Sequence, residues 1–380
     1  MSIPVCNPIA FLIGTFLVCS GTAFSQGVQP AMTTSQPLAW TMQTSGTTAS
    51  LRGIYSVDGK IAWASGTEGT VLRTTDGGAH WTKCSTPPDA QALDFRGVQA
   101  WDGAKALVMA SGPGDKSKIF KTDDGCKTWT LIFKNPDAPD GFFDGFFADW
   151  SDEGGTPLWI GSLLGDPVHG SFRVFDTRDS GASWKQRESP DLALKGTELA
   201  AFAASNSLFP GNEDNDHMAQ IFASGGKGGS IVWIEKSPEH TWSKIPVPIA
   251  SGTDSAGIFS IASHSESVPY RGTIAQRITI IAVGGDYQKP GESAQTAAWS
   301  LDKGLHWTAS TKLPHGYRSA VAYSAEQQAW ITAGTNGSDI SQDDGKTWQP
   351  LDDGNWNALS LPFVVGPKGR IGRLAPAGTK

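Results

Sequence analysis

Five charged side chains occupy one equivalent position when seven short apolar segments of the chain are aligned. The segments read SLRGIYS (50–56), DFRGVQA (94–100), FFDGFFA (142–148), GTELAAFA (196–203), GIFSIAS (257–263), GYRSAVA (316–322) and NALSLPF (357–363). The shared position holds Arg52, Arg96, Asp144, Glu198 and Arg318, with Ile258 and Ala358 at roughly that place in the other two segments. Because arginine binds carboxylates well, these residues are candidates for binding an anionic ligand or a peptide tail. A purely structural ring of ion pairs is the alternative.

A second group of candidates lies in the loop GDPVHG (165–170). Asp166 and His169 in this loop are suited to acid–base work or to metal binding, and a tight Asp-Pro turn is the alternative. The chain has no Cys-x-x-Cys, His-Glu-x-x-His, Gly-x-Ser-x-Gly or Rossmann glycine pattern. We therefore predict neither a cofactor nor a metal, and no motif supports an oxidoreductase.

The elements that position these candidates are marked by a recurring turn, Ser/Thr-x-Asp-x-Gly-x-x-Trp. Its copies are TTDGGAHW (74–81), TDDGCKTW (122–129), TRDSGASW (177–184), SLDKGLHW (300–307) and SQDDGKTW (341–348), and EKSPEHTW (235–242) keeps the Trp alone. Aspartate accepts backbone N–H groups, glycine supplies positive φ, and tryptophan packs between sheets. The residues with these structural roles are Asp76, Trp81, Asp124, Trp129, Asp179, Trp184, Trp242, Asp302, Trp307, Asp343 and Trp348.

Pairs of apolar strands joined by a glycine-containing loop accompany these turns. The last pair, within 363–374, has no turn after it, and LAWTM (38–42) near the start is a strand without a partner. If the N-terminal strand is the outer strand of the last blade, it completes that blade. The ring of blades then has no open sheet edge. We predict an all-β fold, a β-propeller of seven four-stranded blades over residues 38–376. Six blades is the alternative count.

The turn is similar to the Asp-box, or BNR repeat, of sialidases and other propellers. The segments SLRGIYSVDGKIAWASGTEGTVLRTTDGGAHW (50–81) and GSDISQDDGKTWQ (337–349) resemble blades of the photosystem II stability/assembly factor family. The resemblance covers residues 38–376 and is weakest over 205–300. It implies a non-catalytic scaffold that binds a reaction-centre subunit through arginines on one face. Arg52, Arg96 and Arg318 match that pattern, whereas Asp144 and Glu198 depart from it.

A secreted glycoside hydrolase similar to sialidases is the alternative function, and whether the chain is an enzyme stays open. The three arginines, Glu198 and Asp144 would supply its chemistry, with Tyr317 as nucleophile. Tyr317 adjoins Arg318 on a strand, however, so their side chains point to opposite faces. The Arg-Ile-Pro segment of sialidases is also missing.

The N-terminal segment predicts export to the periplasm or the cell exterior. Residues 1–25 have an apolar core over 9–18, too short to cross a bilayer comfortably, and small residues before a cleavage site at Gln26. An uncleaved anchor is the alternative, and residues 26–37 are expected to be flexible. Cys84 and Cys126 remain in the mature chain. An oxidising compartment permits a disulfide between them, and two free thiols are the alternative.

The charge balance restricts the partners. The formal net charge is −7 without a long run of either sign, which argues against nucleic acid. No segment after the signal peptide is apolar enough to cross a membrane. We expect a monomer with a protein partner, for which a membrane-protein subunit or its exposed tail is a candidate.

Overall fold

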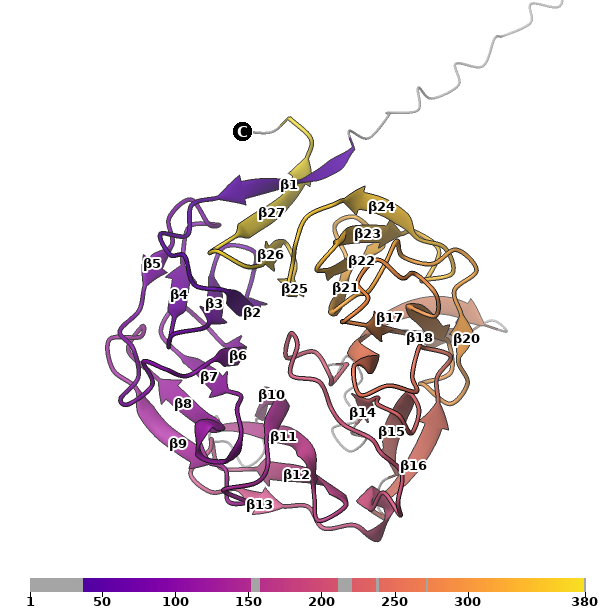
Figure 1. Cartoon of the computed structure of the whole chain (residues 1–380). Coiled ribbons are helices and arrows are strands. Elements are labelled where there is room, and N and C mark those ends of the chain that lie inside the picture. Colours follow the sequence, from indigo (N-terminus) through magenta and orange to yellow (C-terminus); the bar gives the residue numbers. More distant parts are fainter. Residues whose placement is uncertain (1–36, 152–157, 211–220, 237–238, 271–272, 379–380) are drawn as a thin grey trace, which may run out of the picture. The chain divides into compact units, whose positions relative to one another are not determined.

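Seven antiparallel sheets form the blades of a ring in the computed structural model (Figure 1). The structure describes residues 37–151, 158–210, 221–236, 239–270 and 273–378. The predicted signal peptide, 1–25, and the segment 26–36 lie outside these residues. The ring confirms the β-propeller and its count of seven blades. In the described part of the chain, no helix is long and apolar enough to span a bilayer.

The first three blades follow one another along the chain, each with its strands in sequence order. Blade one contains β2 (Leu51–Ser56), β3 (Ala62–Gly66), β4 (Val71–Thr74) and β5 (Thr82–Lys83). Blade two contains β6 (Phe95–Ala100), β7 (Ala106–Ala110), β8 (Lys118–Thr122) and β9 (Thr130–Lys134). Blade three contains β10 (Phe143–Ser151), β11 (Leu158–Val168), β12 (Ser171–Thr177) and β13 (Lys185–Gln186). The short 3-10 helices η1 (Gly114–Lys116) and η3 (Pro190–Leu192) lie in loops.

The next three blades complete most of the ring. Blade four has only β14 (Ile221–Ser224), β15 (Ile231–Lys236) and β16 (Thr241–Pro246). Blade five contains β17 (Ala256–Tyr270), β18 (Thr273–Asp286), β19 (Ala297–Ser300) and β20 (Thr308–Ala309). Blade six contains β21 (Ala320–Ser324), β22 (Ala329–Gly334), β23 (Gly337–Ser341) and β24 (Gln349–Asp352). In blade four an isolated bridge between Ala200 and Gly225 stands where the others have an inner strand.

Blade seven joins the two ends of the described chain, as predicted. It contains β25 (Ala358–Ser360), β26 (Phe363–Val365), β27 (Ile371–Pro376) and β1 (Leu38–Gln43). The indigo β1 lies antiparallel beside the yellow β27 in Figure 1, with Trp40 opposite Leu374. Trp40 packs against Trp356 with ring centroids 6.1 Å apart, and its indole donates to the Ser338 hydroxyl of blade six at 2.9 Å. The N-terminal strand therefore contacts both its own blade, blade seven, and the neighbouring blade six.

The hydrophobic core lies between the blades. One cluster combines Phe95 and Val98 of blade two with Trp63 of blade one. Similar clusters join all the remaining pairs of neighbouring blades. The cluster between blades seven and one contains Phe363 beside Leu51. Since each blade buries both faces in this way, the apolar faces are fully covered only when the ring is closed.

The five complete turns share one hydrogen-bond pattern. In the first, Asp76 accepts the His80 N–H at 2.9 Å and the Thr74 hydroxyl accepts the Gly78 N–H at 2.9 Å. The same bonds recur at Asp124, Asp179, Asp302 and Asp343. The His80 N–H and the Thr128 hydroxyl hold the pKa of Asp76 and Asp124, respectively, at about 2. The tryptophan that follows packs on a neighbouring blade, as Trp184 does on Phe133 at 4.9 Å between centroids.

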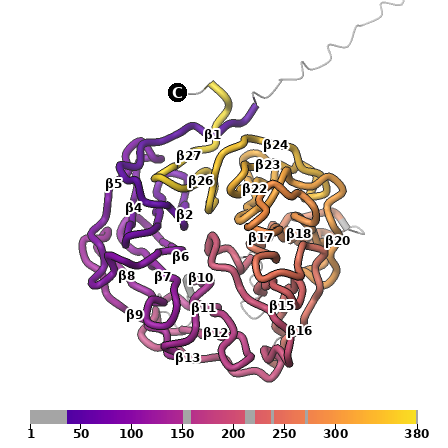
Figure 2. Tube along the Cα trace, in the orientation of Figure 1, coloured from indigo at the N-terminus to yellow at the C-terminus, as the bar shows by residue number. Residues whose placement is uncertain are grey.

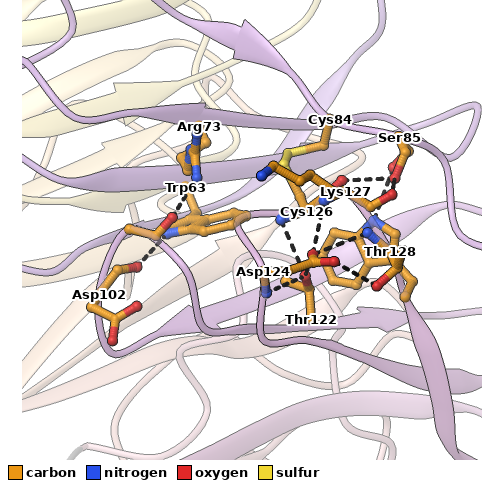
Figure 3. The surroundings of a disulfide bond; sticks show 12 residues. Trp63, Arg73, Cys84, Ser85, Asp102, Thr122, Asp124, Cys126, Lys127 and Thr128 are labelled. Atoms are coloured by element: carbon orange, nitrogen blue, oxygen red, sulfur yellow. Dashed lines mark hydrogen bonds between the residues drawn. A yellow bond between two sulfur atoms is a disulfide. The ribbon is translucent and has the colours of Figure 1, made fainter.

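A disulfide between Cys84 and Cys126 links blades one and two (Figure 3). Cys84 follows β5, and Cys126 lies in the turn of blade two, where the other turns have glycine. Cys126 has φ 63°, and the corresponding glycines have φ between 75° and 86°. The Ser85 hydroxyl donates to the Cys126 carbonyl at 2.7 Å, so the two segments are also joined by a hydrogen bond. Of the two alternatives for these cysteines, the structure contains the bridge.

Removing Trp40 should open the ring. We expect Trp40→Ala to lower the free energy of unfolding by about 3 kcal/mol, because it leaves a cavity against Trp356 and removes the bond to Ser338. Met42→Ala is the matched control on the same strand, where the side chain is 52% exposed, and it should change little. Urea unfolding measures both, and equal midpoints for the two variants would contradict the closure.

Removing the disulfide should destabilise the fold without changing it. The double variant Cys84→Ala, Cys126→Gly keeps a residue that favours the positive φ of the turn. We expect it to lose about 2–4 kcal/mol, because the bridge closes a long loop in the unfolded chain. Thermal unfolding with and without a reducing agent checks this. Reductant should lower the Tm of the wild type alone, and an unchanged wild-type Tm would be the contrary result.

Candidate functional site

The innermost strands of four blades carry a β-bulge at the same level. In β2 the ladder runs from Leu51 directly to Gly53, so Arg52 is left unpaired. The corresponding unpaired residues of β6, β10 and β17 are Arg96, Asp144 and Phe259. A bulge takes its extra residue out of the regular alternation of side chains between the two faces of the strand. Each of these side chains is thereby directed away from the interblade core.

Every blade contributes one residue at this level, and all of them line one central cavity of about 500 Å³. We call this set the pocket ring. Its members are Arg52, Arg96, Asp144, Ala201, Phe259, Ser319 and Asn357. The structure thus places three of the predicted charged residues, Arg52, Arg96 and Asp144, in the cavity.

The predicted alignment was wrong by one residue in the fifth, sixth and seventh blades. Phe259, Ser319 and Asn357 lie at the pocket, in place of Ile258, Arg318 and Ala358. Ile258 and Ala358 are fully buried in interblade clusters. The bulge in the fifth blade is invisible in a sequence alignment, and in the sixth and seventh blades the pocket residue lies immediately before the inner strand. A slip of one residue on a strand exchanges the two faces.

Arg318 is part of the core and does not reach the cavity. Its side chain is fully buried, and its Nε donates to Asp339 Oδ2 at 2.7 Å. The Asn336 amide oxygen and the Tyr317 carbonyl accept from its Nη1. This buried ion pair fixes the inner end of blade six, and burial lowers the pKa of Arg318. Tyr317 faces the other way, into the cavity, as expected for adjacent residues.

Glu198 also lies away from the cavity. Its side chain is 69% exposed and pairs with Lys227 at 3.4 Å. The segment expected to form the inner strand of blade four continues as a loop across the channel, which we call the plug loop (201–208) (Figure 2). An inner strand here was therefore an incorrect prediction.

The plug loop is fastened to four blades. The Ala203 carbonyl accepts from Arg96 Nη1 of blade two at 3.2 Å, and Asn206 Oδ1 accepts the Phe146 N–H of blade three at 2.8 Å. The Ser205 hydroxyl donates to the Ser319 carbonyl of blade six, and the Ser207 hydroxyl to Ser260 of blade five. These bonds span the channel, so the loop obstructs passage through the ring.

The two arginines of the pocket ring lie on neighbouring blades. Arg96 Nε donates to Asp94 Oδ2 at 2.8 Å, which fixes its guanidinium. Arg52 Nε is buried and has no hydrogen-bond partner. Burial and the nearby Arg96 charge lower the pKa of Arg52. An anion placed between the two guanidinium groups would relieve both effects.

Two carboxyl groups of blade three lie in the same cavity. Asp144 is 1% exposed, and its Oδ2 has no hydrogen-bond partner. Asp166, from the loop noted in the sequence, accepts the Ala201 N–H at 3.0 Å and also lines a second cavity of about 410 Å³. Burial raises the pKa of Asp166 to about 6. Burial and the Asp166 carboxyl raise the pKa of Asp144 well above its usual range.

Aromatic side chains form the rest of the wall. The Phe202 ring stacks on Phe259 with centroids 4.1 Å apart, and Tyr317 meets Phe259 edge-on at 4.8 Å. Phe142 and Tyr287 also line the cavity. Apart from Tyr317, which was considered as a nucleophile, sequence reasoning missed these aromatic residues, because none of them lies at the repeat position that was aligned. In the described residues no cluster of three or more His, Cys, Asp or Glu could hold a metal.

Comparisons with known proteins show a likeness of structure. No family model and no curated protein matches the chain. A solved structure described as YCF48 bound to D1 peptide is 18% identical, with a TM-score of 0.55, covering 89% of this chain and 96% of that one. YCF48 from Cyanidioschyzon merolae is 20% identical, with a TM-score of 0.54, covering 88% and 98%. This chain has the fold of YCF48.

The same comparison shows why fold alone does not assign a function. U3-55K is 13% identical, with a TM-score of 0.51, and covers 89% of this chain and 98% of that chain. Propellers with different names thus match over similar lengths. The residues of the pocket, and not the fold, indicate the function.

The buried carboxyl groups predict a pH dependence of stability. The pKa of Asp166 in the folded state lies above its unfolded value, so the folded state retains the proton while the unfolded state loses it. Stability is therefore highest below the unfolded pKa and falls as pH rises toward about 6. We expect Asp166→Asn to be more stable than the wild type at pH 7, by up to about 3 kcal/mol, and equal to it at pH 3. Unfolding curves at the two pH values test this, and a variant less stable at pH 7 would contradict it.

Proposed function

We propose that the chain is an exported, non-catalytic scaffold that binds a protein partner by taking its peptide tail into the central cavity. The observation that carries this proposal is the pair Arg52 and Arg96, which line the central cavity while Arg52 Nε lacks a partner. A carboxylate accepts from two guanidinium groups at once, and burial strengthens such bonds.

The plug loop favours a chain end over a passing segment. Because the loop is bonded to blades on both sides of the channel, it obstructs a segment that would thread through the ring. A chain terminus needs no such passage, and its carboxylate supplies the negative charge that the arginines require. The complex of YCF48 with D1 peptide, a propeller of the same fold, supports peptide binding as the function.

Export is supported by the disulfide as well as by the N-terminal segment. Disulfides persist in oxidising compartments, and the Cys84–Cys126 bridge closes a sequence separation of 42 residues. The periplasm or the cell exterior is the proposed location of the mature chain.

A glycoside hydrolase stays as a second candidate because of one observation. Asp144 and Asp166 share the cavity, and a carboxyl with a raised pKa is suited to act as a general acid. Glu198 and Arg318, two of the residues invoked for that chemistry, lie elsewhere. Turnover of a fluorogenic glycoside panel that disappears in Asp144→Asn or Asp166→Asn would replace the scaffold with an enzyme.

Arginine substitutions test the peptide-binding function. Hexapeptides with a free C-terminus and their amidated counterparts are arrayed and probed with the purified chain. We expect binding of free-acid peptides that falls at least about tenfold in Arg52→Gln and Arg96→Gln, because each removes a charge-assisted bond. Arg178→Gln is the matched control, since Arg178 is exposed on the turn of blade three. Equal binding of acids and amides, or equal loss in the control, would refute the proposal.

A further inference from the structure

The central cavity carries charges of both signs on separate blades. Arg52 and Arg96 come from blades one and two, and Asp144 and Asp166 come from blade three. Among the described residues, no ion pair joins either arginine to either carboxyl, since Arg96 pairs with Asp94 instead. The cavity therefore presents a positive and a negative group that are not bonded to each other.

The negative half contains a buried carboxyl oxygen without a hydrogen-bond partner. Asp144 is 1% exposed and its Oδ2 is unpartnered. A buried acceptor without a partner is costly, and the cost increases when the carboxyl is ionised. A donor brought by a ligand would offset this cost, and a cationic donor would do so most effectively.

The aromatic wall of the cavity suits an aliphatic or cationic stem. Phe202, Phe259 and Tyr317 form a continuous aromatic surface in the cavity. Aromatic faces attract ammonium and guanidinium groups and also pack against the methylene groups of lysine and arginine. The cavity thus combines an anion site, a cation site and an apolar surface.

We propose that the cavity selects a C-terminal tail whose last residue is basic. The terminal carboxylate is held by Arg52 and Arg96, and the lysine or arginine side chain extends over the aromatic wall to Asp166 and Asp144. This inference rests on the proposed peptide-binding function and specifies its ligand.

The proposal predicts that binding releases protons. The other charged and titratable groups that line the cavity with the two carboxyls are Arg52, Arg96, Tyr287 and Tyr317. Burial raises the pKa of Asp166 to about 6 in the empty cavity, and a bound cation favours the ionised form. Affinity for a basic tail should therefore rise as pH increases from 5 to 7, and affinity for a neutral tail should not.

Three labelled hexapeptides, identical except at the C-terminus, test this specificity by fluorescence anisotropy. They end in lysine acid, norleucine acid and lysine amide. On the wild-type chain at pH 7 we expect lysine acid to bind at least about tenfold more tightly than either of the others. Asp166→Asn should remove the preference for lysine over norleucine while preserving the preference for acid over amide. Arg178→Gln should change neither ratio.

The outcomes separate the two proposals. Equal binding of lysine acid and norleucine acid, both tighter than the amide, overturns the basic-tail specificity and leaves the peptide-binding function intact. Absence of binding by all three peptides at millimolar concentration overturns both. A lysine preference that persists in the double variant Asp144→Asn, Asp166→Asn overturns the assignment to these carboxyls. Thermal unfolding confirms that each variant is folded.

Discussion

Burial of both faces of every blade is the constraint on which this structure depends. The interblade clusters join each sheet to its two neighbours, so an incomplete ring would expose the apolar faces at its ends. The pairing of β1 with β27 removes those ends, and Trp40 contacts two blades to do so. The turns with aspartate and tryptophan support the same arrangement from the outside, where the Cys84–Cys126 bridge adds a covalent link between blades one and two.

Closure also creates the candidate site. Each blade directs one side chain at the same level to a shared centre, and in four blades a bulge does so. A site of this kind has its members far apart in sequence and held by a rigid scaffold, so it is preorganised for a ligand. The plug loop crosses the channel and lines the cavity, and the charges divide between blades one and two and blade three. The proposed ligand, an acidic chain end with a basic side chain, follows from that division.

The sequence was sufficient to predict what is local and repetitive. The turn spacing predicted the blades. The unpaired segment at Trp40, together with the incomplete repeat at the other end of the chain, predicted the closure of the ring. The positions of Arg52, Arg96 and Asp144 also followed from the alignment. Neither the bulge at Phe259 nor the exact start of the sixth and seventh inner strands was visible, so Phe259, Ser319 and Asn357 were missed in favour of residues one place earlier or later. The plug loop could not be predicted because its bonds to other blades, such as Asn206 to Phe146, are contacts between distant segments that leave no periodic signal.

The proposed function places the ligand at the middle of the ring. Photocrosslinking tests this placement, with a free-acid peptide that carries a benzophenone next to its C-terminus and mass spectrometry to locate the adduct. Binding in the cavity predicts adducts within the plug loop or on the cavity wall, at residues such as Phe142 and Tyr287, and their loss in Arg52→Gln. Adducts on the outer strands or on the tryptophan turns, unaffected by that substitution, would contradict it.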